Sequence, residues 1–149
     1  MGTGSTQMTT GQKAPIVELT PDLSKIVEAI LLVLKAAADR GKSVTQYDIV
    51  KTLFLADRHH LNEYGRPITF DNYKAMKHGP VPSFAYNLLR GDRYELSQLD
   101  FELPWTASPV AGSRAKIYKA THEPDPEALS PSEIEALLDS LAVVSTLGF

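Results

Sequence analysis

A dense group of glycines and prolines divides this chain and limits the folds open to it. The group lies within residues 65–82 and comprises Gly65, Pro67, Gly79, Pro80 and Pro82. Gly79 and Val81 each precede a proline, which disfavours helical backbone and favours extended backbone at both positions. Because proline also interrupts helical hydrogen bonding, one long helix cannot cross this segment. We therefore expect helices on both sides of a rigid, extended corner.

The residues before the corner predict two helices joined by a short link. The first begins at residues 20–22, where threonine can cap, proline suits the first turn and aspartate complements the helix dipole, and it ends at Gly41. The second begins at Thr45, with Asp48 three residues on as in a capping box, and ends at Gly65. Apolar residues recur at helical spacing along both segments, so the pair should form a helical hairpin.

Within the corner, short extended pieces are expected around Ile68 and over residues 73–76. Ser83 is expected to cap a short helix over residues 84–89. Residues 99–103 and 115–120 alternate in the manner of strands and predict a β-hairpin with a long connection.

The last helix is expected to begin at residues 130–133, whose Ser-Pro-Ser-Glu sequence supplies a cap, a first-turn proline and a glutamate that reaches back. Leu129 and Ile134 occupy staple positions on either side of it. The fold expected is α+β and mainly helical: a helical hairpin and short helices with a small antiparallel β-hairpin or sheet.

The composition fits one domain. The chain has 149 residues, of which 43% are hydrophobic, enough for a single core. Residues 1–18 are rich in Gly, Thr, Ser and Gln and are expected to form a flexible tail before a domain of residues 19–149, with Met8 a candidate native start. No apolar run approaches the roughly 18 residues of a membrane span and no signal peptide is recognisable. A cytoplasmic location without a membrane partner is therefore expected.

Enzymatic chemistry has little support in the residue pattern. The chain lacks cysteine, no serine lies in G-x-S-x-G, and glycine-rich phosphate loops are missing. Asp57 and His60 share a helix face and could begin a metal site, but the H-E-x-x-H spacing is absent and His59 points about 100° away. The alternative is structural, with Asp57 paired to Arg58 and His60 a satisfied helix-face residue. We expect no enzyme, no metal and no cofactor.

Charge leaves two kinds of partner open. The net charge of −3 argues against a strongly basic nucleic-acid binder, but residues 51–94 carry seven Lys or Arg against four Asp or Glu and could meet an acidic partner. A winged-helix-like DNA-binding unit is also compatible with the element order, with Arg114, Lys116 and Lys119 on the wing. The second helix has few basic residues in its first turns, so DNA reading is the weaker alternative.

One stretch resembles a known family. Residues 51–89 read KTLFLADRHHLNEYGRPITFDNYKAMKHGPVPSFAYNLL. They contain a K-x-L-F-x-A-D-x-x-H-L helix, a Y-G-R-P-I-T turn and a Y-x-A-M-K-x-G-P-V-P segment, in order and without gaps. This combination resembles the Panacea domain of the SocA-like antitoxin family, and the remaining elements fit the family's layout more loosely.

The resemblance implies an antitoxin that neutralises a toxin protein encoded beside it, by direct binding or as an adaptor that delivers the toxin to a cellular protease. It brings no catalytic residues. Related chains often continue past the last helix, so the resemblance implies that a partner-binding tail is missing or reduced here. The alternative function is a DNA-binding transcriptional regulator, including of its own operon.

Candidate toxin-binding residues are the polar, aromatic and flexible members of this stretch together with the lone tryptophan: Asp57, His60, Arg66, Tyr73, Met76, Lys77, Tyr86 and Trp105. The glycines and prolines of the corner would hold them rigidly, which favours binding. Methionine surfaces also adapt to diverse partners. Trp105 either anchors a partner or plugs its own core. A buried Asp57, bonded to backbone or paired with Arg66 or Lys77, would be structural, whereas an exposed cluster would be a binding patch.

Overall fold

The computed structural model describes residues 20–77, 79–91, 96–97 and 99–147. The predicted flexible tail, residues 1–18, lies outside these ranges. The described helices are α1 (Leu23–Asp39), α2 (Gln46–Tyr64), α3 (Ser83–Arg90) and α5 (Pro131–Leu147). The described strands are β2 (Val44–Thr45), β3 (Tyr73–Met76), β4 (Gly79–Pro82), β5 (Trp105–Pro109) and β6 (Lys116–Ala120). The predicted class, α+β and mainly helical with small antiparallel sheets, is confirmed.

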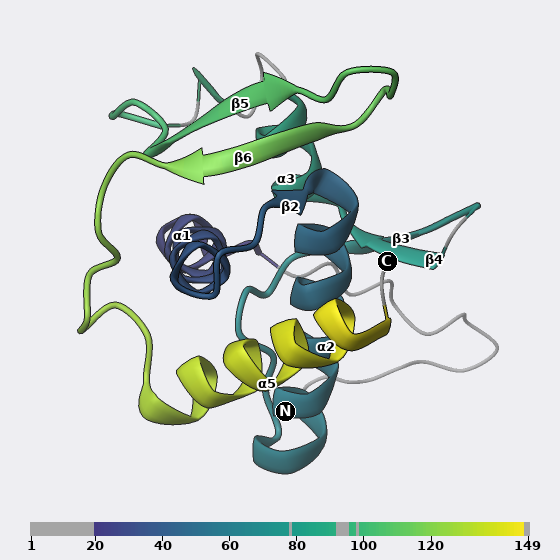
Figure 1. Cartoon of the computed structure of the whole chain (residues 1–149). Helices are drawn as coiled ribbons and strands as arrows, with labels where there is room; N and C mark the ends of the chain where they lie inside the picture. The colour runs from purple at the N-terminus through teal and green to yellow at the C-terminus, as the bar shows by residue number, and fades with distance from the viewer. Residues whose placement is uncertain (1–19, 78, 92–95, 98, 148–149) are drawn as a thin grey trace, which may run out of the picture.

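The helices cross one another beneath a small sheet. In Figure 1, α1 is seen along its axis, while α2 and α5 cross beside it. The sheet has the order β2-β6-β5 with antiparallel pairing, and it lies above α1. Fully buried aliphatic side chains from α1, α2 and α5, such as Ile30, Leu53 and Leu137, form the core. Burial of apolar surface between these layers is the main driving force of folding.

Local capping explains where most helices begin and end. Asp22, rather than Thr20, caps α1 by accepting a hydrogen bond from the Lys25 amide at 3.1 Å. The predicted Thr45–Asp48 capping box is present at the start of α2. Gly65 ends α2 in the left-handed region at φ 80°, where glycine avoids the cost of a Cβ.

The corner is a β-hairpin. The extended backbone predicted over residues 73–76 is confirmed as β3, and it pairs antiparallel with β4, which contains both prolines. This second strand was not predicted as a partner, because a Gly-Pro-Val-Pro sequence reads as a corner rather than as a paired strand. Ile68 lies in a buried bend and not in a strand, so the extended piece predicted around it is wrong.

The first strand of the later hairpin was placed too early. Residues 99–103 form no strand, and β5 instead spans Trp105–Pro109 and pairs with β6. Trp105 is buried and packs into the core at the start of β5. Its burial determines the register of this strand, which the alternation of apolar and polar residues did not predict correctly. The predicted strand at residues 115–120 is confirmed as β6 within one residue.

Candidate protein-binding site

Asp57 organises the corner from inside the protein. It is buried on α2, and its carboxylate accepts four hydrogen bonds across the loop that follows the helix. The donors are the backbone N–H groups of Ile68 (2.7 Å) and Thr69 (3.0 Å), the Thr69 hydroxyl (2.6 Å) and the Tyr73 hydroxyl (2.7 Å). Burial, followed by the nearby charge of Asp57, raises the pKa of Tyr73 well above its ordinary value. Tyr73 therefore stays protonated and keeps donating to Asp57.

His60 connects the same loop to the last helix. Its ring is fully buried, with Nδ1 2.7 Å from the Arg66 carbonyl oxygen and Nε2 2.9 Å from the Ser132 hydroxyl. Because a carbonyl only accepts, Nδ1 carries the proton of that bond. The Nε2–Ser132 contact completes the hydrogen bonding of the ring. His60 is thus a satisfied internal residue, as the structural alternative proposed.

The buried carboxylate of Glu133 on α5 contacts one cation from α1 and one from the loop after α2. Its side chain is 0% exposed, and one oxygen lies 2.6 Å from both Lys25 Nζ and an Arg66 guanidinium nitrogen. The other oxygen accepts from the Ser130 N–H at 2.7 Å, which completes the predicted capping box of α5. Burial alone would raise the pKa of Glu133, but hydrogen bonds from Lys25, Arg66 and Ser130 outweigh it and lower the pKa to about 2.

Asp71 caps α3 from a distance in sequence. Its carboxylate accepts from the N–H groups of Phe84 and Ala85, each at 2.9 Å, and of Asn72 at 2.8 Å. Ser83 was predicted to be this cap, but its hydroxyl donates to the Asn72 carbonyl at 2.7 Å and makes no cap bond. That prediction is wrong because an acidic side chain from the loop already occupies the N–H groups at the helix start. Burial raises the pKa of Asp71, and the three accepted bonds oppose the shift.

The buried polar residues thus make internal contacts. Neither Arg58, Arg66 nor Lys77 pairs with Asp57; Arg66 pairs instead with Glu133. The described residues contain no group of three or more His, Asp or Glu side chains with the geometry of a metal site. Trp105 is 7% exposed and plugs the core, the second of its two predicted roles.

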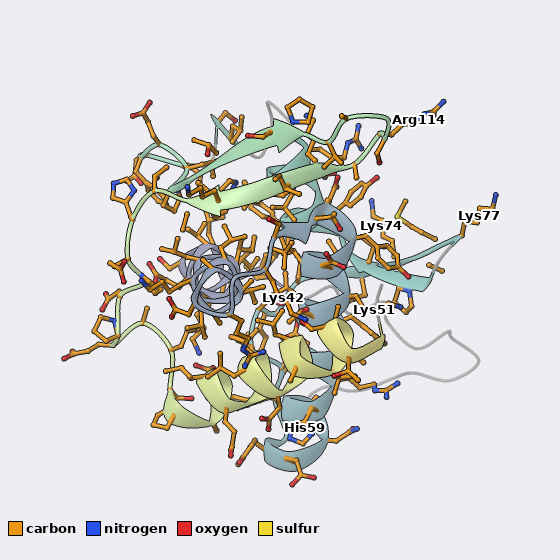
Figure 2. All side chains as sticks on the ribbon, viewed as in Figure 1. Lys42, Lys51, His59, Lys74, Lys77 and Arg114 are labelled. Atoms are coloured by element: carbon orange, nitrogen blue, oxygen red, sulfur yellow. The ribbon has the colours of Figure 1, made fainter. Side chains whose placement is uncertain are left out.

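Three of the candidate residues do face the surface together. Met76, Lys77 and Tyr86 line one concavity of about 360 Å³, between the first turns of α2, the β3–β4 hairpin and the loop joining β5 to β6. Met76 is 46% exposed, and Lys77 lies near the free end of the hairpin. Figure 2 shows Lys77 and Arg114 extending outward on the same side of the molecule.

The remaining lining residues were not among the candidates: Thr45, Gln46, Tyr47, Val50, Lys51, Pro80, Val81, Arg114 and Ala115. Several come from outside the motif, so only the fold reveals that they meet. The sequence indicated a binding role for Arg114 only as a cation on the wing of a DNA-binding unit. Lys51 begins the motif itself, and its Nζ lies 5.8 Å from the centre of the Tyr47 ring.

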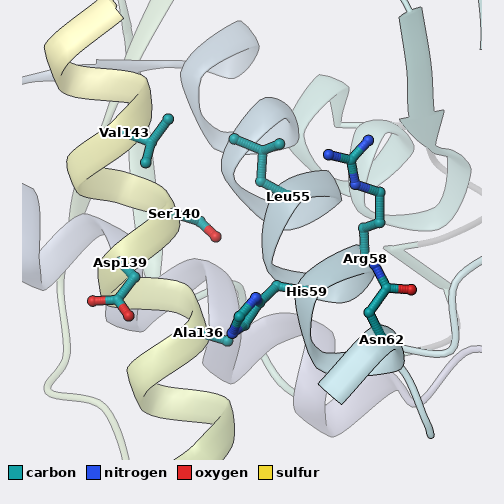
Figure 3. Close-up of a pocket in the computed structure, with 8 residues that line it drawn as sticks. All are labelled: Leu55, Arg58, His59, Asn62, Ala136, Asp139, Ser140 and Val143. Atoms are coloured by element: carbon teal, nitrogen blue, oxygen red, sulfur yellow. The ribbon is translucent and has the colours of Figure 1, made fainter. Parts of the chain in front are cut away.

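A second, smaller groove runs between α2 and α5. It has a volume of about 270 Å³, and Figure 3 shows His59 pointing toward α5 while Arg58 on the same helix points away. Asp139 and Val143 form part of the α5 side, and Val143 is 48% exposed. Both a cation, Arg58, and a carboxylate, Asp139, line this groove, whereas none of the described residues that line the first concavity is acidic.

A comparison with protein families decides what kind of domain this is. The model of the antitoxin SocA-like, Panacea domain family matches residues 49–148, which is most of the chain. The chain belongs to this family. Among the curated proteins and the solved structures, neither search found a match. The Panacea match covers α2 from Ile49 onward, the hairpin and α5, so the loosely fitting elements beyond residue 89 are part of the domain too. Within the described residues, no helix has the length and hydrophobicity needed to cross a membrane.

Proposed function

We propose that this Panacea-domain protein is an antitoxin that binds a toxin protein encoded beside it and thereby neutralises it. The observation that carries the proposal is the family match over residues 49–148. Two features of the structure support it. The buried polar residues hold the β3–β4 hairpin against α2, and an apolar, cation-rimmed concavity opens beside that hairpin. A rigid surface with exposed apolar and charged groups suits protein binding, because little ordering cost remains to be met on association.

Binding does not require this protein to catalyse a reaction. The buried polar groups of the motif, such as Asp57 and His60, are engaged in hydrogen bonds that hold the fold. The cations and apolar side chains that line the concavity are available for contact with a partner. Proteins neutralised in this way lose their activity through coverage of their surface. We therefore take the activity to be stoichiometric capture of the toxin in the cytoplasm.

Co-expression with the adjacent gene tests the proposal. The adjacent gene product should arrest growth when expressed alone, and this chain should restore growth and co-purify with it. If the adjacent product is harmless alone, or if this chain neither binds it nor restores growth, the proposal fails. The toxin level during rescue separates two routes: an unchanged level indicates coverage, and a level that falls only when a cellular protease is present indicates delivery to that protease.

A second function has one specific observation in its favour. Apart from the β3–β4 hairpin between α2 and α3, the order α1, β2, α2, α3, β5, β6, with β2 paired to β6, is similar to a winged-helix arrangement in which the β5–β6 loop carries Arg114. Regulation of its own operon would follow from DNA binding by such a unit. Against this, α3 offers Arg90 as its single cation. A mobility shift on the upstream DNA, with affinity that falls as salt rises, is the expected result if this second function is correct.

A further inference from the structure

The concavity beside the hairpin combines an apolar floor with a rim of one charge. Its apolar members include Val50 on α2, Met76 and Val81 on the hairpin, and Tyr86 on α3. Its charged members are Lys51, Lys77 and Arg114, and none of the described residues that line it is acidic. In a chain whose net charge is −3, this is a local concentration of positive charge.

The walls of the concavity are fixed by the interior. Tyr73, the first residue of β3, is bonded to the buried Asp57, and the Ser83 N–H after β4 donates to the Asn72 carbonyl at 2.9 Å. Both strands are therefore anchored at the base of the hairpin, where Tyr73 pairs with Pro82. Gly79, at φ 114°, brings the backbone of β4 close to Lys51: a Cβ there would lie 3.7 Å from the ammonium nitrogen. The Lys51 ammonium group and the backbone of β4 therefore lie next to each other on this surface.

One polar group in the lining has unused hydrogen-bonding capacity. The Gln46 side-chain nitrogen is buried and has no hydrogen-bond partner among the described residues. Buried amide donors usually have a partner, so this one calls for an explanation. Gln46 is the first residue of α2 and is among the residues that line the concavity.

We propose that this concavity is the toxin-binding site and that it takes an acidic segment of the toxin carrying one large apolar side chain. The apolar side chain occupies the floor between Val50, Val81 and Met76. The flanking carboxylates pair with Lys51, Lys77 and Arg114 at the rim. The proposal rests on the antitoxin function proposed above and specifies the chemistry of its partner.

A protein segment fits this surface better than a nucleic acid. Phosphate backbones are recognised by extended basic surfaces, and their contacts do not need an aliphatic floor. Here Val50, Met76 and Val81 lie between the cations, and the chain as a whole is acidic. A buried apolar anchor surrounded by complementary charges is instead the usual composition of a protein hot spot.

The first test uses a defined probe: a short fluorescein-labelled peptide of Asp and Glu with a central Phe-Leu pair, followed by fluorescence anisotropy with the full chain. The double variant K77E/R114E should lower the affinity at least about tenfold, because two attractions become repulsions. The control K42E/K119E makes the same change in net charge at two exposed positions outside the concavity, and it should stay within about twofold of wild type. Equal loss in both variants, or equal binding of a peptide with Lys in place of the acids, overturns the proposal.

The second test addresses the apolar anchor. Met76→Ser should weaken binding of the same peptide about tenfold, since the methionine is part of the floor. Val143→Ser is the matched control, because Val143 has nearly the same exposure, 48% against 46%, but lies in the groove between α2 and α5. If Val143→Ser weakens binding and Met76→Ser does not, the interface lies in that other groove and the proposal is wrong.

Growth rescue separates failure of this site from failure of the antitoxin function. If the wild-type chain rescues growth and K77E/R114E does not, while K42E/K119E does, the site is supported. If all three chains rescue growth and bind the toxin equally, the antitoxin function stands and this site is overturned. If the wild-type chain fails to rescue, the antitoxin function itself is contradicted. Binding of DNA by wild type but not by K77E/R114E, with no binding of the acidic peptide, also overturns the proposal.

Discussion

The motif contributes to two polar regions that are close in sequence but differ in solvent exposure. The first is the buried polar network of Asp57, His60 and Asp71, which is extended by Glu133 from α5; its members are at most 4% exposed. The second is the concavity around Met76 and Lys77, whose polar side chains reach solvent. A residue can therefore belong to the family motif without contacting a partner. The buried network determines where the hairpin lies, and the concavity is what a partner can reach.

The largest expected effect tests the buried network at its centre. Asp57→Asn replaces an oxygen that accepts hydrogen bonds with an NH₂ group that faces donors, within a network of four bonds. We expect the free energy of unfolding to fall by about 4 kcal/mol. Urea denaturation measures it, and Asp39→Asn, at an exposed carboxylate, is the control. A loss as small as that of the control would mean that Asp57 does not hold the corner.

Glu133→Gln should have the next largest effect and a distinctive pH dependence. The pKa of Glu133 is about 2 in the folded protein against an ordinary value of 4.5. A lowered pKa stabilises the fold above pH 4.5, and this stabilisation is lost as the pH falls toward 2. The shift corresponds to about 3 kcal/mol at neutral pH.

The measurement is the difference in unfolding free energy between wild type and Glu133→Gln at several pH values. It should be about 3 kcal/mol at pH 7 and shrink between pH 4.5 and 2. Glu135→Gln, in the same helix turn but exposed, should leave the pH profile unchanged. A difference that does not depend on pH would show that packing, and not the charge of Glu133, connects the three segments.

A smaller change in the free energy of unfolding is expected at the start of α3, where Asp71 and Ser83 are the two possible caps. Asp71→Ala removes a carboxylate that accepts three backbone hydrogen bonds and should cost about 2 kcal/mol. Ser83→Ala removes one neutral bond to the Asn72 carbonyl and should cost about 1 kcal/mol or less. Thermal or urea unfolding of the pair decides between them. A larger loss of stability for Ser83→Ala than for Asp71→Ala would indicate that Ser83 is the cap.

The smallest effect is expected in the concavity. Met76→Ser and Lys77→Glu should each change the free energy of unfolding by less than about 0.5 kcal/mol, because both side chains are exposed and neither belongs to the buried network. Urea denaturation of both variants, alongside the wild type, is the measurement. A loss comparable to that of Asp71→Ala would remove the distinction between the two regions.

The features that could be predicted from the sequence depend on neighbours in the chain. The Thr45–Asp48 box, the Gly65 stop and the Ser130–Glu133 box each involve residues three or four apart or a single conformational preference, so local rules suffice. The family resemblance likewise followed from one continuous stretch. The end of α1, just before Gly41, was predictable for the same reason.

The features that escaped prediction depend on pairs that are distant in sequence. Lys25 and Glu133 are 108 residues apart, and Asp71 reaches amides 13 and 14 residues away. Local capping rules therefore favoured Ser83, the nearer side chain. Strand β5 was misplaced because the burial of Trp105, which determines its register, is a property of the packed core. The concavity could not be assembled from the sequence, since Lys51, Lys77 and Arg114 meet only after three segments have packed.

The contacts of Glu133 also order the events of synthesis. Its carboxylate neutralises cations on α1 and on the loop after α2, and both of these segments leave the ribosome well before α5 does. Until α5 is made, Lys25 and Arg66 lack their shared counter-charge, and His60 lacks the Ser132 hydroxyl. A nascent chain that lacks α5 therefore lacks the contacts that join α1 and the loop after α2 to this helix. The ion pairs that connect these three segments would form late in each round of translation, after most of the chain has been made.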